Sequence, residues 1–182
     1  QNFYNYTLIG KVVDSATQEA LENVAIEDDV KSVGLVGSIA YTGETGDFKL
    51  EGEYQKETTF KIKVESTSGG NKYFIEDGQQ ADIDVKYGNK YIFDVSDTSV
   101  TGHPFLLSTT SNGVHGGGSV YSTGVTYFLD DVATSETDYK NTTNFNAATK
   151  RQVKFTVPAE GSFPTFLYYY CHVHSGMGGS IV

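Results

Sequence analysis

Hydrophobic and polar residues alternate along much of this chain. The segment TFKIKVES (59–66) places an aromatic and two aliphatic side chains on one face of an extended strand, with charged side chains on the other. The same period of two recurs in ADIDVKY (81–87) and QVKFTVP (152–158). Such alternation is typical of half-buried antiparallel strands. No helical apolar period persists along the sequence, so the pattern predicts an all-β protein.

A polar stretch with adjacent glycines, STSGGN (66–71), interrupts this pattern. Stretches of this composition are typical of loops and linkers. We therefore predict two β-sandwich domains, residues 1–70 and 71–182, each with its own core. A second polar segment, residues 130–152, lies between two patterned strands of the second domain, and we expect it to form a long surface excursion.

Charge and cysteine content narrow the classes of function. The 182-residue chain has a formal net charge of −10, which disfavours binding to nucleic acid and to anionic membranes. No apolar run reaches the roughly 18 residues of a membrane-spanning helix, so we expect no membrane insertion. The one cysteine cannot form an internal disulfide bond. No nucleophile–base arrangement, phosphate-binding loop or paired-carboxylate motif is recognisable, so we expect no enzyme.

Two hairpin patterns mark the first half. IGKVVDSATQEALENVAI (9–26) predicts a strand, a turn beginning at Asp14 and a returning strand, and TGETGDFKLEG (42–52) predicts a second hairpin with its turn near Gly46. The motifs G-x-V-x-D-x-x-T and T-x-x-x-G-x-F-x-L in these segments resemble those of carboxypeptidase-regulatory-like, transthyretin-type domains over residues 7–65. The resemblance implies a seven-strand sandwich that serves as a spacer, adhesion or assembly module without catalysis.

The N-terminal segment QNFYNYT has two interpretations. Its aromatic residues Phe3, Tyr4 and Tyr6 could form an assembly strand that is added to a neighbouring subunit. Alternatively, the segment begins the first strand of its own domain, which we favour because terminal strands usually dock within their own chain. Asn5 and Asn141 each lie in an N-x-[ST] tripeptide, so both are candidate glycosylation sites if the protein is secreted.

The segment YYYCHVHSGMGG (168–179) contains the only cysteine and the only methionine of the chain. Two residues separate Cys171, at the end of an aromatic strand, from His174, and two more separate His174 from Met177. The neighbouring glycines permit a tight loop that brings thiolate, imidazole and thioether toward one point. His103 in VTGHPF, near the end of another strand, offers a fourth ligand. A cysteine, two histidines and a weak axial methionine form the trigonal copper site of electron-transfer proteins.

Four segments of the second half carry a further resemblance. They are YFIEDGQQADIDVKYGNKYIFDVSDTSVTGHPFLLS (73–108), YSTGVTY (121–127), VKFTVPAE (153–160) and LYYYCHVHSGMGG (167–179). Together they resemble cupredoxin-like domains, Greek-key β-sandwiches such as those in proteins of marine bacteria and their phages, and the match spans nearly all of residues 72–182. The resemblance implies one copper ion bound by His103, Cys171, His174 and Met177.

Other interpretations of these residues stay open. Zinc would use the cysteine and the two histidines and leave Met177 idle. The four residues could also be a vestigial ligand set in a structural sandwich, since buried Cys and Met are ordinary core residues. His172 neighbours Cys171 on the strand end and so points to the opposite face, where we expect packing or solvent exposure. His115 lies in a glycine-rich loop, and we expect it to be solvated.

These features favour a non-enzymatic extracellular, cell-surface or virion-surface protein. The first domain would serve spacing or assembly, and the second would carry the copper site, with self-association or other surface and virion proteins as partners. One alternative is a copper-binding electron-transfer protein, which the complete ligand set favours. Another is an adhesion module that binds glycans or proteins through its aromatic- and glycine-rich loops. The domain pairing favours the structural interpretation, since electron carriers are usually single small domains.

Overall fold

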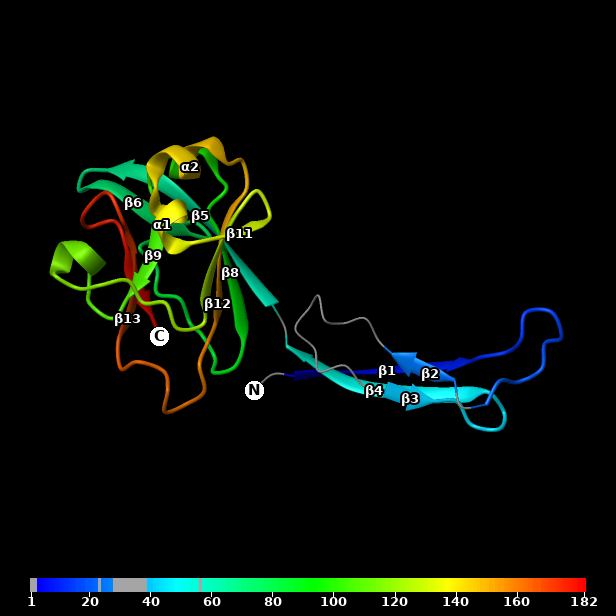
Figure 1. Cartoon of the computed structure of the whole chain (residues 1–182). Coiled ribbons are helices and arrows are strands. Elements are labelled where there is room, and N and C mark those ends of the chain that lie inside the picture. The colour runs from blue at the N-terminus through cyan, green and yellow to red at the C-terminus, as the bar shows by residue number, and fades with distance from the viewer. Residues whose placement is uncertain (1–2, 23, 28–38, 56) are drawn as a thin grey trace. The chain divides into compact units, whose positions relative to one another are not determined.

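The computed structural model describes residues 3–22, 24–27, 39–55 and 57–182. Strands dominate these residues and helices are few and short, which confirms the predicted all-β class. The chain divides into two compact units, Asn2–Lys56 and Glu57–Val182 (Figure 1). Within the described ranges, no helix combines the length and the apolar character needed to cross a membrane.

The smaller unit contains two antiparallel strand pairs. β1 (Phe3–Lys11) pairs with β4 (Asp47–Gln55), and β2 (Ala25–Glu27) pairs with β3 (Ile39–Tyr41). Residues 28–38, which connect the second pair, lie outside the described residues. The seven-strand, transthyretin-type sandwich that the sequence resemblance implies therefore stays a prediction.

Both turns predicted for this unit are present. The carboxylate of Asp14 accepts hydrogen bonds from the backbone N–H groups of Ala16 and Thr17, both at 2.8 Å, and these bonds lower the pKa of that carboxyl. Gly46 has a φ of +73°, a conformation that side chains with a Cβ rarely adopt. A Cβ on Gly46 would also lie 2.4 Å from the carbonyl oxygen of Val12, so the close approach of the two hairpins requires glycine there.

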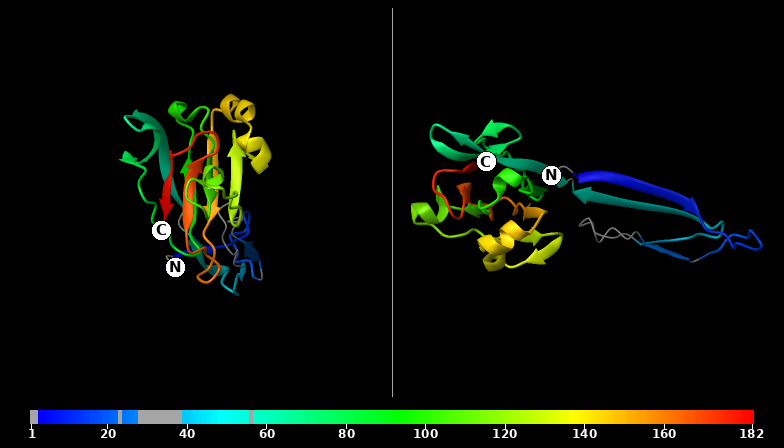
Figure 2. Two further views of the ribbon diagram at one scale, coloured as in Figure 1. Left: turned by 90° about the vertical axis from the view of Figure 1, so that its left-hand side faces the viewer. Right: turned by 90° about the horizontal axis from the view of Figure 1, so that it is seen from above.

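The larger unit contains two β-sheets (Figures 1 and 2). The seven-stranded sheet has the order β11-β10-β12-β8-β5-β6-β7, and the three-stranded sheet has the order β14-β13-β9. Neighbours are antiparallel except β5 and β8, which are parallel. The strands are β5 (Glu57–Thr67), β6 (Gly70–Ile75), β7 (Gly78–Gln79), β8 (Lys90–Asp94), β9 (Phe105–Ser108), β10 (Val125–Leu129), β11 (Val132–Thr134), β12 (Arg151–Thr156), β13 (Leu167–Cys171) and β14 (Gly179–Ile181).

The division between the units differs from the predicted boundary after residue 70. β5 pairs with β8 and β6 of the larger unit, so residues 57–70 belong to that unit. The polar stretch at residues 66–71 is the hairpin between β5 and β6, in which the Thr67 hydroxyl donates to the carbonyl of Gly70 at 2.8 Å. A glycine pair in a polar stretch is typical of a hairpin turn as well as of a linker between domains. The pairing of β5 with β8, which are distant in sequence, shows that this stretch is a hairpin turn.

One core lies between the two sheets of the larger unit. The rings of Phe93 in β8 and Phe105 in β9 have centroids 5.2 Å apart. The rings of Tyr73 in β6 and Tyr169 in β13 have centroids 6.3 Å apart. All four of these side chains are buried. The alternating pattern predicted the inward positions of β12, where every second residue is buried up to Phe155. The strand predicted at residues 81–87 is absent, since only Ile83 makes an isolated bridge there, to Ile181. This core fixes the ends of β9 and β13, from which the candidate site is built.

The predicted excursion at residues 130–152 contains structure that its polar composition did not predict. Two short helices, α1 (Glu136–Lys140) and α2 (Thr142–Ala147), follow β11. Asn141 caps α2, since its side-chain oxygen accepts hydrogen bonds from the backbone N–H groups of the next turn. Each helix buries one aromatic side chain, Tyr139 or Phe145, in the core.

Candidate metal centre

His103 lies just before β9, after the short 3-10 helix η2 (Thr98–Val100). Its backbone N–H donates to the carbonyl of Val100 at 2.9 Å. Its own carbonyl accepts a hydrogen bond from the buried hydroxyl of Tyr73 at 2.7 Å. Gly102, with a φ of +80°, donates its N–H to the side chain of Asn146 at 2.7 Å. The backbone of His103 is thus fixed from three sides, which orients the imidazole.

Cys171 is the last residue of β13, and strand pairing brings it to His103. In the antiparallel register, Cys171 lies opposite Phe105, the first residue of β9. The pairing continues one step further, because the N–H of His172 donates to the carbonyl of Pro104 at 2.9 Å. The two sequence-distant donors therefore meet at one end of the three-stranded sheet, as the sequence predicted.

The loop between β13 and β14 supplies His174 and Met177. The N–H of His174 points to the sulfur of Cys171 at 3.4 Å, so the chain turns back sharply after the cysteine. The side chain of Asn112 accepts from the N–H of Gly176 and donates to the hydroxyl of Ser175, both at 2.8 Å. A second segment also holds this loop, because the backbone N–H of Tyr73 in β6 donates to the carbonyl of Met177 at 3.0 Å.

Three candidate ligand atoms converge in this arrangement. The sulfur of Cys171 lies 3.8 Å from Nδ1 of His103 and 3.8 Å from Nδ1 of His174. All three atoms lie within 4.8 Å of one another, and the two imidazole rings have centroids 4.6 Å apart. His103 and Cys171 are buried, whereas His174 is exposed. The group could hold a metal ion whose only solvent-facing ligand is His174.

The two sulfur–nitrogen distances suit a metal ion bound between the donors. Bonds of about 2.3 Å to sulfur and about 2.1 Å to nitrogen, at about 120° to each other, separate the donors by about 3.8 Å. A tetrahedral angle of about 109° would bring them to about 3.6 Å. The observed sulfur–nitrogen distances of 3.8 Å lie close to both values, so they suit a bound metal ion of either geometry.

Met177 lies beside this group. Its side chain is only 1 % exposed, and it lines a cavity of about 480 Å³ together with His174 and His115. A buried thioether in this place is suited to weak axial coordination. Its role as the fourth ligand stays a prediction.

Burial sets the protonation of the donors in the absence of a metal. Desolvation, and secondarily the neighbouring His174, lower the pKa of His103, which leaves its imidazole neutral and able to coordinate near pH 7. Desolvation raises the pKa of the Cys171 thiol, although hydrogen bonds from the N–H groups of His174 and Val173 and from the Tyr73 hydroxyl act in the opposite direction. A metal ion would have to displace the thiol proton on binding.

The contacts that His115, Asn112 and Tyr73 make near the site were not predicted. Nε2 of His115 lies 3.1 Å from the carbonyl oxygen of Cys171, so this exposed histidine contacts the site as well as solvent. Asn112 and Tyr73 hold the ligand loop and His103, as described above. His172 is half-buried, lies outside the three-ligand group, and has a buried Nδ1 with no hydrogen-bond partner among the described residues.

The remaining candidate residues have separate locations. Phe3, Tyr4 and Tyr6 lie in β1 opposite Gln55, Tyr54 and Gly52 of β4, so the backbone of this segment pairs within its own chain. Asn5 lies in the same strand. Asn141 is exposed at the start of α2, where its side-chain oxygen serves as the helix cap. Assembly through β1 and glycosylation at Asn5 and Asn141 stay predictions.

Comparisons of this chain with protein-family models, with curated proteins and with solved structures found no significant match.

Proposed function

We propose that this chain is a non-enzymatic protein of an extracellular, cell-surface or virion assembly. Its larger unit is a cupredoxin-like Greek-key sandwich that binds one copper ion through His103, Cys171, His174 and Met177. Its smaller unit is a transthyretin-type module that serves spacing or assembly. The convergence of one thiol and two imidazoles carries the copper part of this proposal.

Copper suits the donor set better than zinc does. Thiolate and thioether favour Cu(I), while imidazole binds both oxidation states of copper. Structural zinc sites take four tetrahedral ligands, but the described His, Cys, Asp and Glu residues near this point supply three. Met177 completes the set only for a metal that accepts a thioether.

The strand pairing within the smaller unit supports the assembly part of the proposal. β1 and β4 form a two-stranded sheet, so each has an edge without a strand partner among the described residues. Unpaired strand edges are templates for pairing with another chain. A strand of nine residues, such as β1, offers enough backbone groups for such an interface.

Electron transfer by the same centre is the second candidate function. The observation that favours it is the exposure of His174 next to two buried ligands, since an exposed ligand gives electrons a short path to the surface. The two functions share the copper site and differ in whether the bound ion changes oxidation state in use.

Titration of the reduced, purified chain with Cu(II) tests the copper site. We expect one equivalent to bind and to produce an intense visible thiolate-to-copper charge-transfer band. Cys171→Ser should abolish this band. His172→Gln is the matched control, because the neighbouring His172 lies outside the three-ligand group, and it should keep the band. A colourless complex, or a band that survives Cys171→Ser, would contradict the proposal.

A further inference from the structure

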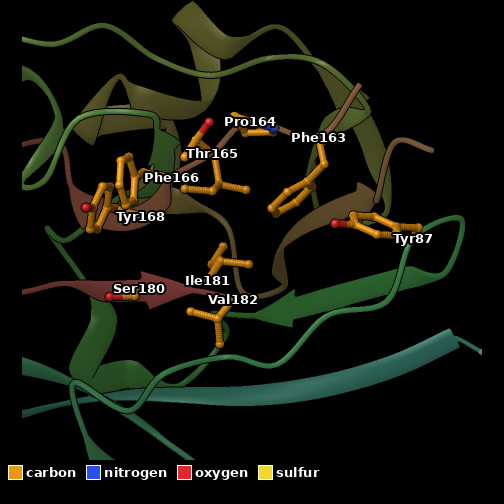
Figure 3. Close-up of a pocket in the computed structure, with 10 residues that line it drawn as sticks. Tyr87, Phe163, Pro164, Thr165, Phe166, Tyr168, Ser180, Ile181 and Val182 are labelled. Carbon is orange, nitrogen blue, oxygen red and sulfur yellow. The ribbon is translucent and has the colours of Figure 1, made fainter. Parts of the chain in front are cut away.

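An aromatic cavity of about 520 Å³ lies near the other end of β13 from the metal centre (Figure 3). Three segments of the larger unit form it: residue 87, residues 163–168 and residues 180–182. The pairing of Leu167 with Ile181 across β13 and β14 fixes its floor, and both side chains are buried. Its volume lies within the range of about 300–1,000 Å³ that is typical of small-molecule sites.

Two pairs of aromatic rings flank this cavity. Tyr87 and Phe163 contact each other edge to face on one side, with ring centroids 5.8 Å apart. Phe166 and Tyr168 lie nearly parallel on the other side, with centroids 6.5 Å apart and an interplanar angle of 20°. Figure 3 shows Ile181 and Val182 across the space from Thr165 and Pro164. Phe166 is 62 % exposed and Tyr87 is 43 % exposed, so ring surface at the mouth is available to a ligand.

The chemistry of the lining selects a neutral ligand that carries hydroxyl groups. None of its ten lining side chains is charged near neutral pH. Hydroxyl groups of Tyr87, Thr165, Tyr168 and Ser180 belong to the lining, and Figure 3 shows the Tyr87 hydroxyl directed toward the space. A phosphate or a charged peptide would find no counter-charge among these side chains, and a purely aliphatic lipid would leave the hydroxyls unused.

A sugar ring has the complementary surface. The C–H groups on one face of a pyranose carry partial positive charge, which matches the negative face of an aromatic ring. Its equatorial hydroxyls project outward from the ring, where they can meet hydroxyl partners at a rim. A second cavity of about 530 Å³ shares Tyr87 and is lined also by Val85, Lys86, Ala159 and Glu160. The ring of Tyr87 therefore borders both spaces, and the two charged side chains of the second, Lys86 and Glu160, are of opposite sign, so a chain of linked sugar rings would meet no net charge there.

From these observations we infer that the cavity between Tyr87–Phe163 and Phe166–Tyr168 binds an uncharged oligosaccharide. The sugar rings stack on the exposed faces of Tyr87 and Phe166, and the rim hydroxyls hold the ring hydroxyls. This site is independent of the metal centre, because none of its lining residues belongs to the copper ligand set.

Saturation-transfer NMR and calorimetry on the full chain test the inference. The probes are neutral hexasaccharides of β-linked glucose, α-linked glucose and β-linked mannose, with a hexamer of galacturonic acid as the charged counterpart. We expect at least one neutral probe to bind and the charged one to bind more weakly. Phe166→Ala should weaken binding by about threefold to tenfold, the factor for one aromatic contact. Tyr41→Ala, a 65 % exposed tyrosine outside the cavity, is the matched control and should leave affinity unchanged.

Three results would overturn the inference. The first is the absence of saturation transfer to every neutral probe. The second is binding that is unchanged in both Phe166→Ala and Tyr87→Ala. The third is a shift in sedimentation coefficient in Phe166→Ala, which would make a second copy of the chain the occupant of this surface. Copper-dependent absorption should be the same in Phe166→Ala as in the unaltered chain, so failure here does not bear on the metal site.

Discussion

At the scale of single residues, the candidate centre combines donors whose environments differ. Cys171 and His103 are buried, so both lose solvation of their charged forms, and His174 stays in contact with solvent. Without a metal, the neutral thiol and imidazoles make only long sulfur–nitrogen contacts of 3.8 Å. The same three donor atoms could instead hold a metal ion, which requires the thiol to lose its proton.

Copper affinity should depend on pH in a direction set by Cys171. Burial raises the pKa of its thiol, so the metal-free protein carries this proton and loses it on binding. Apparent affinity should then rise by about tenfold per pH unit while the pH stays below the thiol pKa. Because the pKa of His103 is lowered, protons compete with the metal for this imidazole only at more acidic pH. Competition titrations with a copper chelator between pH 6 and 8 measure this slope, and a pH-independent affinity would contradict thiolate ligation.

Replacement of Met177 by leucine tests the axial position. The change nearly conserves volume at a buried position, so we expect stability to change by less than about 1.5 kcal/mol. Loss of the thioether removes a weak donor to Cu(II), and the reduction potential of the bound copper should rise. Protein-film voltammetry of Met177→Leu and of the unaltered chain measures the difference. An unchanged potential would show that the methionine is a core residue only.

At the scale of elements, the site depends on strand pairing and on one tight loop. The register of β13 against β9 places Cys171 beside His103, and the loop of residues 172–178 returns His174 to the same point. Asn112 and Tyr73 hold the two sides of this loop. The loop is thus fixed by contacts to other segments, which favours a preorganised metal geometry.

Gly178→Ala should disrupt this loop. A Cβ on Gly178 would lie 1.8 Å from the carbonyl oxygen of Tyr169, a backbone atom that cannot move without breaking β13. We expect a loss of stability of about 1–3 kcal/mol and weaker copper binding, because the ligand loop would have to shift. Gly43→Ala is the matched control, since a Cβ there meets nothing within 4 Å. Chemical unfolding of both variants gives the comparison; equal stability would contradict this account of the loop.

The sequence predicted β5, β12 and the convergence of the three donors, but the alternation at residues 81–87 was wrong as a strand and the contacts that hold the donors were not predicted. The alternation of polar and apolar residues in β5 indicates directly which side chains are buried. The positions of His103 and Cys171 next to strand ends, and the short spacing from Cys171 to His174, indicate that these residues can meet. The boundary after residue 70 was wrong because a Gly–Gly turn is compatible with both a hairpin and a linker. The contacts of Asn112 and His115 were not predictable, since they depend on where a glycine-rich loop folds against a distant strand.

At the scale of the whole molecule, the hydrophobic core of the described residues lies within one unit. This core belongs to Glu57–Val182 and includes Cys171 and Met177, and His103 of the same unit is also buried. All strands that position these ligands belong to the same unit. The larger unit therefore contains the complete candidate site, as expected for a domain that folds by itself.

The isolated fragment of residues 57–182 should fold and bind copper. Copper at about 100 times its dissociation constant should stabilise the folded fragment by about 2.7 kcal/mol, because the ion binds the native state selectively. Differential scanning calorimetry with and without the ion measures this gain. The Cys171→Ser fragment is the control and should gain little. A fragment that is unfolded, or that is stabilised equally in both forms, would contradict the assignment of the site to this unit.

X-ray absorption spectroscopy of the copper-loaded full chain tests the central claim most directly, because it identifies the atoms bound to the ion. We predict one short copper–sulfur bond and two copper–nitrogen bonds from imidazole, with the sulfur contribution lost in Cys171→Ser. Copper surrounded only by nitrogen and oxygen, with a spectrum unaffected by that substitution, would contradict the claim.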